Sequence, residues 1–100
     1  MKDFDHPSQD EIELTKVLAA LGDPVRLKIV LQLSKSKAET NYADLECEVG
    51  KATLSHHLKT LRLAGIIVHR REGTRCYLSL RNDVEKIYPG ILKSILKAAT

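Results

Sequence analysis

Basic side chains gather in the second half of the chain, where they could neutralise a polyanion. Residues 51–81 carry seven Lys and Arg residues against one acid, a net charge of +6, and residues 1–13 carry five acids against one Lys. Three of the four His residues also lie within 51–81. Clustered Arg and Lys are what neutralisation of phosphates requires, although a basic stretch can also be an ordinary solvated surface. The meaning of this cluster depends on the elements that carry it.

The length and composition fit one small folded domain. The chain has 100 residues, of which 43% are hydrophobic and 29% charged, a balance typical of soluble globular proteins. We expect a flexible N-terminal arm over residues 1–9 and a single domain over residues 10–100. No apolar run is long enough to span a bilayer and the N-terminus is acidic, so we expect a cytoplasmic protein that contacts no membrane.

Two helices are expected in the first third of the chain. The first, over about residues 9–21, has apolar residues at i, i+3, i+4 and i+7: Leu14, Val17, Leu18 and Leu21. Asp23 followed by Pro24 is an N-cap with proline at the first helical position, where the missing N–H costs nothing. The second helix, over about residues 24–35, is apolar around most of its circumference, and we expect it to be the buried central helix.

A helix-turn-helix is expected next. Thr40 or Asn41 can cap a short helix that runs through about Cys47. A glycine-containing turn then leads into a longer helix over about residues 51–64, whose leucines recur at i, i+4 and i+7: Leu54, Leu58 and Leu61. Two helices joined in this way form the helix-turn-helix arrangement.

A β-hairpin and a final helix complete the pattern. The β-prone runs 66–70 and 75–80 flank a polar, glycine-containing tip at 71–74, which predicts a wing. The last helix spans about residues 82–97, and the Pro89-Gly90 pair should kink or break it. The predicted fold is therefore mainly α, a winged helix-turn-helix of five helices and a two-stranded wing.

Three segments together match a pattern of known function: LGDPVRLKIV at residues 21–30, LSHHLKTLRLAGII at 54–67 and RREGT at 70–74. In this order and spacing they resemble the ArsR/SmtB family of bacterial winged-helix repressors, over about residues 10–97. The resemblance implies a homodimer, paired through its first and last helices, that binds double-stranded DNA at a palindromic operator. It also implies that an inducer releases the protein from DNA.

The chain departs from the metal sensors of that family at the residues that would bind metal. The Cys-x-Cys pair of the arsenic and cadmium sensors is absent, because Cys47 stands alone between Glu46 and Glu48. The zinc sensors place Asp and His pairs on the last helix, which here contains no His. A zinc site commonly needs four N, S or O ligands, so we expect no metal site and no cofactor.

The helix over about 51–64 is the predicted reading element. At about 100° per residue, Leu54 points inward while Ala52, His56 and Lys59 point outward, so that face is available to the major groove. The side chains on it that we assign to DNA are Lys51, Ala52, Thr53, Ser55, His56, Lys59 and Thr60. His57 is expected to pack and hydrogen-bond against the second helix. Arg26 is either structural or a phosphate contact.

Two further sets of residues follow from the predicted fold. The wing should carry Arg70, Arg71 and Arg75 to the minor groove or its phosphates. The first and last helices offer more apolar surface than one small core can hide, so they should form the dimer interface. The residues assigned to that interface are Leu14, Val17, Leu18, Ile91, Leu92 and Ile95.

Other function classes fit the sequence less well. No Gly-rich phosphate loop, nucleophile arrangement or paired acids on one helix face occur, which argues against an enzyme. The alternatives left open are a winged-helix module that binds protein or RNA, and a repressor that senses redox through Cys47 and Cys76. The acids beside Cys47 disfavour its thiolate, and we expect no disulfide between the two cysteines. The inducer is not identified by the sequence.

Overall fold

The computed structural model describes residues 4–36 and 38–100. Its first half contains η1 (Gln9–Glu11), α1 (Leu14–Leu21), α2 (Pro24–Lys35), β1 (Thr40–Asn41) and η2 (Tyr42–Asp44), where η is a 3-10 helix. Its second half contains α3 (Lys51–Leu63), β2 (Ile67–Glu72), β3 (Arg75–Leu80), α4 (Asp83–Ile87) and α5 (Ile91–Ala99). The winged helix-turn-helix prediction is confirmed, with one more strand than expected.

The central helix α2 begins where the sequence predicts. The Asp23 carboxylate accepts hydrogen bonds from the backbone N–H groups of Val25 at 2.8 Å and Arg26 at 3.1 Å, and Pro24 occupies the first turn. These contacts satisfy donors that a helix start leaves without partners. Helix α2 packs against α1, α3, α5 and β3, as expected of a central helix, but only Ile29, Val30 and Leu33 are buried, so it is less buried than predicted.

The wing belongs to a three-stranded antiparallel sheet in the order β1-β3-β2. β2 and β3 pair from Ile67 opposite Leu80 to Glu72 opposite Arg75, which leaves a two-residue turn at the tip. The unexpected strand β1 pairs Thr40 with Leu78. A strand of two residues is too short to show an alternating pattern, so sequence periodicity could not predict it.

The short helix predicted from Thr40 or Asn41 through Cys47 is wrong. Asn41 does act as a cap, accepting a hydrogen bond from the N–H of Ala43, but the turn it starts is only η2. Gln32 on α2 then holds the backbone of Glu46 from both sides: the Glu46 N–H donates to Gln32 Oε1 at 2.9 Å, and Gln32 Nε2 donates to the Glu46 carbonyl at 2.6 Å. This pairing takes the groups that a continued helix would use.

The first and last predicted helices are each divided. Residues 12–13 are extended between η1 and α1, because Ile12 is buried against Gly65. A Cβ on Gly65 would lie 2.5 Å from the side chain of Ile12, and the φ of +86° at this position also favours glycine. The predicted break at Pro89-Gly90 is confirmed: α4 and α5 are separate, and Gly90 has a φ of +85°.

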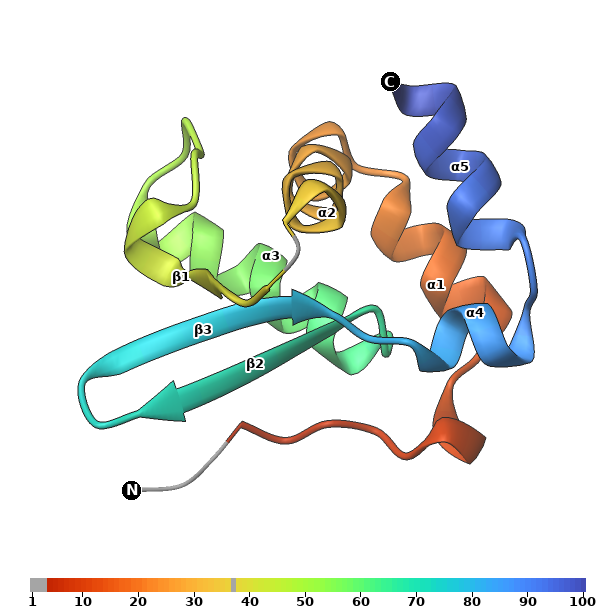
Figure 1. The fold of residues 1–100 in the computed structure, drawn as a ribbon, viewed down its shortest axis with the longest axis horizontal. Coiled ribbons are helices and arrows are strands. Elements are labelled where there is room, and N and C mark those ends of the chain that lie inside the picture. The colour runs from red at the N-terminus through yellow and green to blue at the C-terminus, as the bar shows by residue number, and fades with distance from the viewer. Residues whose placement is uncertain (1–3, 37) are drawn as a thin grey trace.

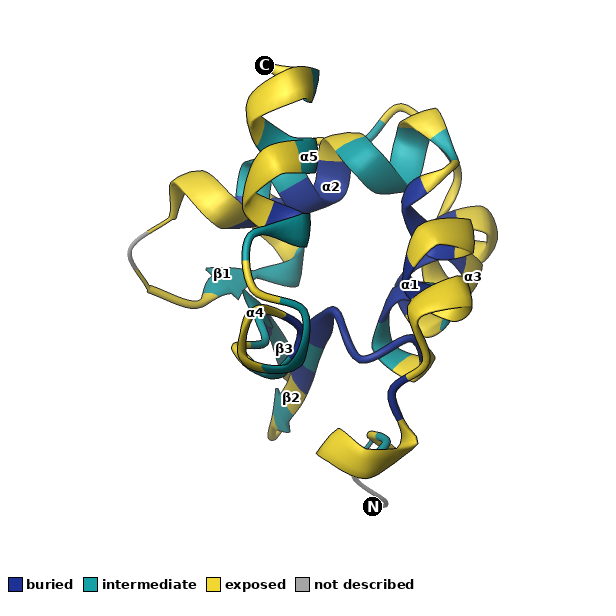
Figure 2. Ribbon diagram, turned by 90° about the vertical axis from the view of Figure 1, so that its right-hand side faces the viewer, coloured by how far each residue is buried: buried dark blue, intermediate teal, exposed yellow. Residues whose placement is uncertain are grey.

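The arrangement of the elements separates two ends of the molecule. Helices α2 and α3 pack against the sheet, while α1, α4 and α5 lie at the end opposite the wing tip (Figure 1). In a view of that end, the buried parts of α1, α2 and α3 face the interior and yellow, exposed surfaces face outward (Figure 2). Within the described part of the chain, no helix is long and apolar enough to cross a membrane.

The N-terminal segment, here residues 4–8, runs beside β2, the edge strand of the wing (Figure 1). The backbone N–H of His69 donates to His6 Nε2 at 3.0 Å, and the Phe4 ring stacks on the His69 ring with 3.7 Å between centroids. Residues 1–3 of the predicted arm lie outside the described residues. The flexibility expected of the arm over residues 1–9 stays a prediction.

Candidate nucleic-acid interface

The interface is built on α3, whose two faces differ sharply in exposure. Leu54, His57, Leu58 and Leu61 are buried. The outward residues Lys51, Ala52, Thr53, Ser55, His56 and Lys59 are all exposed. Thr60 is half-buried, and its hydroxyl donates to the His56 carbonyl at 3.1 Å. Because α3 contains no Asp or Glu, its exposed face combines small, hydroxyl and basic groups without an opposing charge.

The orientation of α3 is fixed by a contact with α2. Arg26 Nη1 donates to His57 Nδ1 at 3.3 Å, Nε donates to the Ala20 carbonyl at 2.7 Å, and Nη2 donates to the Ala19 carbonyl at 3.4 Å. One guanidinium therefore joins the C-terminal turn of α1 to α2 and α3. The prediction for His57 is confirmed, and the alternatives left open for Arg26 resolve to a structural role in this conformation.

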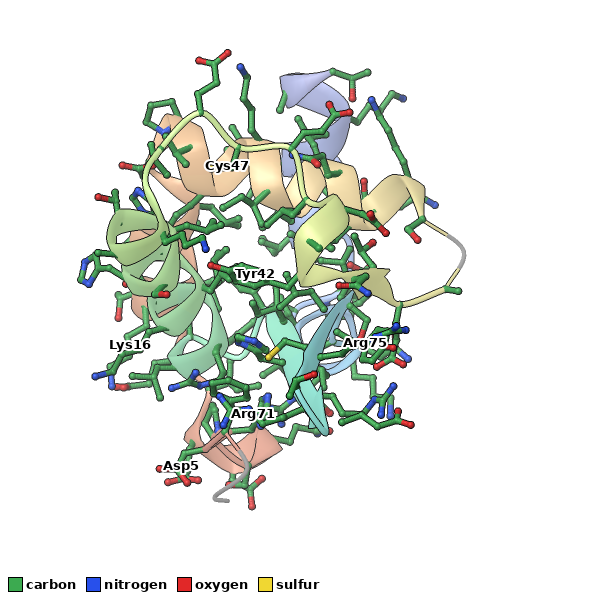
Figure 3. All side chains as sticks on the ribbon, turned by 90° about the vertical axis from the view of Figure 1, so that its left-hand side faces the viewer. Asp5, Lys16, Tyr42, Cys47, Arg71 and Arg75 are labelled. Atoms are coloured by element: carbon green, nitrogen blue, oxygen red, sulfur yellow. The ribbon has the colours of Figure 1, made fainter. Side chains whose placement is uncertain are left out.

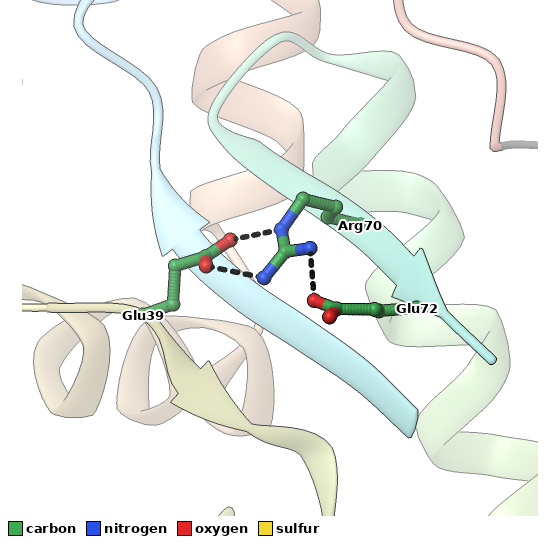
Figure 4. A network of polar contacts seen from close by, with 3 residues as sticks. All are labelled: Glu39, Arg70 and Glu72. Atoms are coloured by element: carbon green, nitrogen blue, oxygen red, sulfur yellow. Dashed lines mark hydrogen bonds and ion pairs between the residues drawn. The ribbon is translucent and has the colours of Figure 1, made fainter. Parts of the chain in front are cut away.

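Arg70 is engaged by the chain's own carboxylates (Figure 4). Its Nε and Nη2 atoms donate to the two oxygens of Glu39 at 2.8 and 2.7 Å, and Nη1 donates to Glu72 at 2.8 Å. Its guanidinium carbon also lies 4.7 Å from the centre of the Tyr77 ring. The hydrogen bonds to Glu39 and then Glu72 raise the pKa of Arg70. Two carboxylates therefore already balance the charge of Arg70, and a phosphate would have to compete with them.

Arg71 and Arg75 flank the wing tip on β2 and β3. Arg75 is exposed, whereas Arg71 is half-buried, and the guanidinium carbon of Arg71 lies 5.0 Å from the centre of the Phe4 ring. In a view onto the wing tip, Arg71 lies between Tyr42 and the N-terminal segment that carries Asp5 (Figure 3). The two arginines therefore differ in exposure and in neighbours, although both lie on one hairpin.

A groove of about 670 Å³ separates α3 from the wing. Its walls come from the N-terminal segment, the β1–η2 region, α3 and the hairpin. The lining residues that bear on function are Phe4, Tyr42, Ser55, Arg62, Arg71 and Arg75. Among the residues that the structure describes, none that lines this groove is an acid. Sequence reasoning missed Phe4, Tyr42 and Arg62 as site residues, and only the basic count over 51–81 included Arg62.

His69 forms part of the same groove and is buried, with 7% of its surface exposed. Burial, followed by the positive charges of Arg62, His6 and Arg71, lowers its pKa to about 4. The imidazole is therefore neutral at pH 7. Sequence analysis counted this histidine in the basic stretch and gave it no role.

The residues assigned to the dimer interface divide into two groups. Leu14 and Leu18 on α1 are 37% and 47% exposed, and Ile91 and Ile95 on α5 are half-buried. Val17 and Leu92 are buried inside the protomer, so their assignment to a surface is wrong. Their side chains follow the inner stripe of each helix, and the spacing of apolar residues alone could not separate core from surface.

Leu63 is an exposed apolar residue to which the sequence analysis gave no role. Leu63 at the end of α3 is 46% exposed. It lies two residues after Leu61, which turns it about 200° from the leucine stripe, so helical geometry could have found it.

The two cysteines are free and half-buried. Cys76 lines the groove beside the wing, and Cys47 lines a second groove of about 610 Å³ between α2 and residues 46–49. Among the described residues, no group of three or more His, Cys, Asp or Glu side chains could hold a metal ion.

Comparisons with known proteins agree with this geometry. Residues 23–68 match the family described as "Bacterial regulatory protein, arsR family". The chain is 36% identical to the uncharacterized HTH-type transcriptional regulator YceK of Bacillus subtilis, over 88% of this chain and 90% of that one. It is 37% identical to the cadmium resistance transcriptional regulatory protein CadC homolog of Staphylococcus aureus, over 79% of this chain and 66% of that protein.

A solved structure shows the same fold. The crystal structure of Rv0081 from M. tuberculosis aligns with 85% of this chain and 87% of that one, with a TM-score of 0.63 and 21% sequence identity. Identity at this level speaks for the fold alone.

Proposed function

Because the chain belongs to the arsR family of bacterial regulatory proteins and is a DNA-binding transcriptional regulator, we propose that it is a repressor that binds a palindromic operator as a homodimer. Residues 10–100 would form one unit for DNA binding and dimerisation. Helix α3 would enter the major groove, and the wing would contact the adjacent backbone or minor groove.

The observation that carries this proposal is the outward face of α3. Thr53, Ser55 and His56 are exposed on a helix whose opposite face is buried. Hydroxyl, imidazole and small methyl groups can meet base edges in the major groove, where each base pair has a distinct pattern. Lys51 and Lys59 lie on the same surface and can neutralise phosphates.

The dimer is supported by exposed apolar surface at the end opposite the wing. Leu14 and Leu18 are exposed on α1, and Ile91 and Ile95 are only partly covered on α5. A domain of 100 residues buries its surface incompletely, which favours association. A two-fold dimer would place two α3 helices about 34 Å apart, one helical turn of DNA.

The experiment is footprinting on the DNA upstream of the chain's own gene, followed by affinity measurements at several salt concentrations. We expect a protected palindrome and a steep loss of affinity as salt rises, because bound phosphates release counterions. Lys59→Gln should reduce the salt slope by about one, whereas the control Lys93→Gln on α5 should leave it unchanged. The proposal fails if no upstream duplex binds better than random DNA.

Sedimentation of the same protein tests the dimer. We expect a dimer at micromolar concentration, and Leu18→Glu should shift it toward monomer because it places a charge in the proposed apolar interface. If the wild-type protein sediments as a monomer at micromolar concentration and still binds the operator, the homodimer is contradicted.

A further inference from the structure

The groove between α3 and the wing already holds an aromatic ring supplied by the chain itself. Phe4 stacks on His69 with 3.7 Å between ring centroids and an interplanar angle of 18°. The guanidinium carbons of Arg62 and Arg71 each lie 5.0 Å from the centre of the same ring. A planar ring is therefore surrounded by an imidazole and two cations.

Phe4 matches the shape of this place but not its polar groups. Both ring nitrogens of His69 and Nε of Arg62 are buried and have no hydrogen-bond partner within the described part of the chain. Buried donors and acceptors in folded proteins are nearly always paired, and leaving them unpaired is unfavourable. A phenyl ring offers no strong acceptor. An occupant whose ring takes the place of Phe4 and whose acidic group accepts from Arg62 Nε would fit the shape and supply an acceptor that the phenyl ring lacks.

The charges of the groove favour an anion. Its described lining includes Arg62, Arg71 and Arg75, and no acid is among the described residues that line it. With His69 held neutral by burial and by the neighbouring cations, its imidazole can still donate one hydrogen bond and accept another. The volume of about 670 Å³ lies within the range of small-molecule sites.

We propose that this groove binds a small aromatic carboxylate, whose ring replaces Phe4 on His69 and whose carboxylate bonds to Arg62. Arginine suits this role because its planar guanidinium can pair with both oxygens of a carboxylate. The observed position of Phe4 thus supplies the template for the ring, and the unpaired Nε of Arg62 supplies a donor for the acid.

The segment that carries Phe4 is suited to displacement. Residues 4–8 form neither helix nor strand, and the contact from β2 to His6 is a single hydrogen bond of 3.0 Å. Irregular segments that lack helix or ladder hydrogen bonds open at lower cost than regular elements do. Because Ser55 and Arg75 also line the groove, occupancy would alter two proposed DNA contacts; this consequence rests on the proposed function, whereas binding itself does not.

The test is a titration of the 100-residue chain with benzoate in the absence of DNA. Two-dimensional ¹H–¹⁵N NMR spectra recorded at each step detect binding. Benzamide and benzylamine keep the ring and change the charge, and acetate keeps the charge without the ring. We expect saturable shifts at His69, Ser55 and Cys76 with benzoate, and at least tenfold weaker binding of the other three compounds. Equal binding of benzamide or benzylamine would exclude an anion site, and equal binding of acetate would exclude a site for the ring.

Variants separate the two parts of the proposal. Phe4→Ala should strengthen benzoate binding at least threefold, because the ring no longer competes for its place. Arg62→Gln should weaken it at least tenfold, whereas the matched control Lys35→Gln, in the second groove, should change it less than twofold. If Arg62→Gln unfolds, Arg71→Gln serves in its place with at least a threefold loss expected.

The opposite results overturn the proposal. Unchanged or weaker binding by Phe4→Ala would show that the ligand does not take the place of the ring. Equal losses in the arginine variant and in Lys35→Gln would show that benzoate responds only to net charge. The titrations contain no DNA, so their result does not depend on whether the protein binds an operator. The benzoate site and the proposed repressor function can therefore fail separately.

Discussion

The exposed groups of α3 and the arginines of the wing, which are the two sets of proposed DNA contacts, differ in the partners that they have within the protein. On α3, Ser55 and Lys59 are exposed, and within the described residues their side chains make no hydrogen bond or ion pair. On the wing, Arg70 bonds to Glu39 and Glu72, and Arg71 lies against Phe4. The proposed reading face of α3 is therefore anchored by its buried side and has exposed groups on the other, whereas two of the three wing arginines already contact groups of the chain itself. On the proposed function, base contacts by α3 would need no prior rearrangement of side chains, whereas phosphate contacts by the wing would compete with contacts inside the protein.

The largest expected effect comes from breaking the buried face of α3. Leu61 is fully buried and Leu63 is 46% exposed on the same helix. Leu61→Ala should lower the free energy of unfolding by about 2–5 kcal/mol, because it leaves a cavity in the core. Leu63→Ala should change it by about 0.5 kcal/mol or less. Urea unfolding monitored by circular dichroism measures both, and equal losses would mean that α3 is not anchored by one face.

The wing region should respond to acid through His69. Its pKa is about 4 in the folded protein, against 6.5 for an exposed histidine. Between these two values the unfolded chain binds the proton and the folded chain does not, so stability falls as the pH is lowered from 7 to 4. The free energy of unfolding lost over this interval is at most about 3 kcal/mol.

His69→Phe isolates this contribution. It removes the titrating group, so the free energy of unfolding should depend less steeply on pH in this interval than it does in the wild type. Urea unfolding at pH 7, 5.5 and 4.5 measures the difference. If the free energy of unfolding depends on pH equally in the two proteins, His69 is not the cause of the acid sensitivity.

Releasing Arg70 from its carboxylates should raise the affinity of the wing for DNA of any sequence. Glu39→Gln removes the charge that pairs with two guanidinium nitrogens, so we expect about threefold tighter binding to operator and random DNA alike, with a steeper salt dependence. The control Glu13→Gln releases Lys16 on α1 and should have a smaller effect. A gain confined to operator DNA would mean that the wing reads sequence.

The smallest expected effect concerns the two thiols. Cys47 and Cys76 line separate grooves, and we predict that peroxide, zinc and arsenite leave operator affinity unchanged within about twofold. Titrations with and without peroxide, repeated with Cys47→Ser and Cys76→Ser, check this. A loss on oxidation that either substitution abolishes would identify a redox sensor.

Features encoded by neighbouring residues were predictable from the sequence. The start of α2 follows from Asp23 and Pro24, whose cap contacts lie within three residues. The leucine spacing gave α3 and its outward face. The break between α4 and α5 follows from Pro89-Gly90, since both residues disfavour a continuous helix.

Features set by distant partners were not predictable. The helix expected through Cys47 is replaced because Gln32 binds Glu46. Arg70 was assigned to DNA from its place on the basic wing, and its pairing with Glu39, which lies 31 residues away, follows from no local pattern. Phe4 reaches His69 across most of the chain, so the groove that it fills appears only in the folded protein.

The central claim is that α3 reads sequence while the wing binds phosphates, and the ratio of operator affinity to random-DNA affinity tests it most directly. Thr53→Ala and His56→Ala should lower this ratio about tenfold by removing contacts to base edges. Arg75→Ala should weaken both affinities equally, leave the ratio unchanged and reduce the salt slope by about one. Equal losses from both groups of variants on every sequence would contradict the placement of α3 in the major groove.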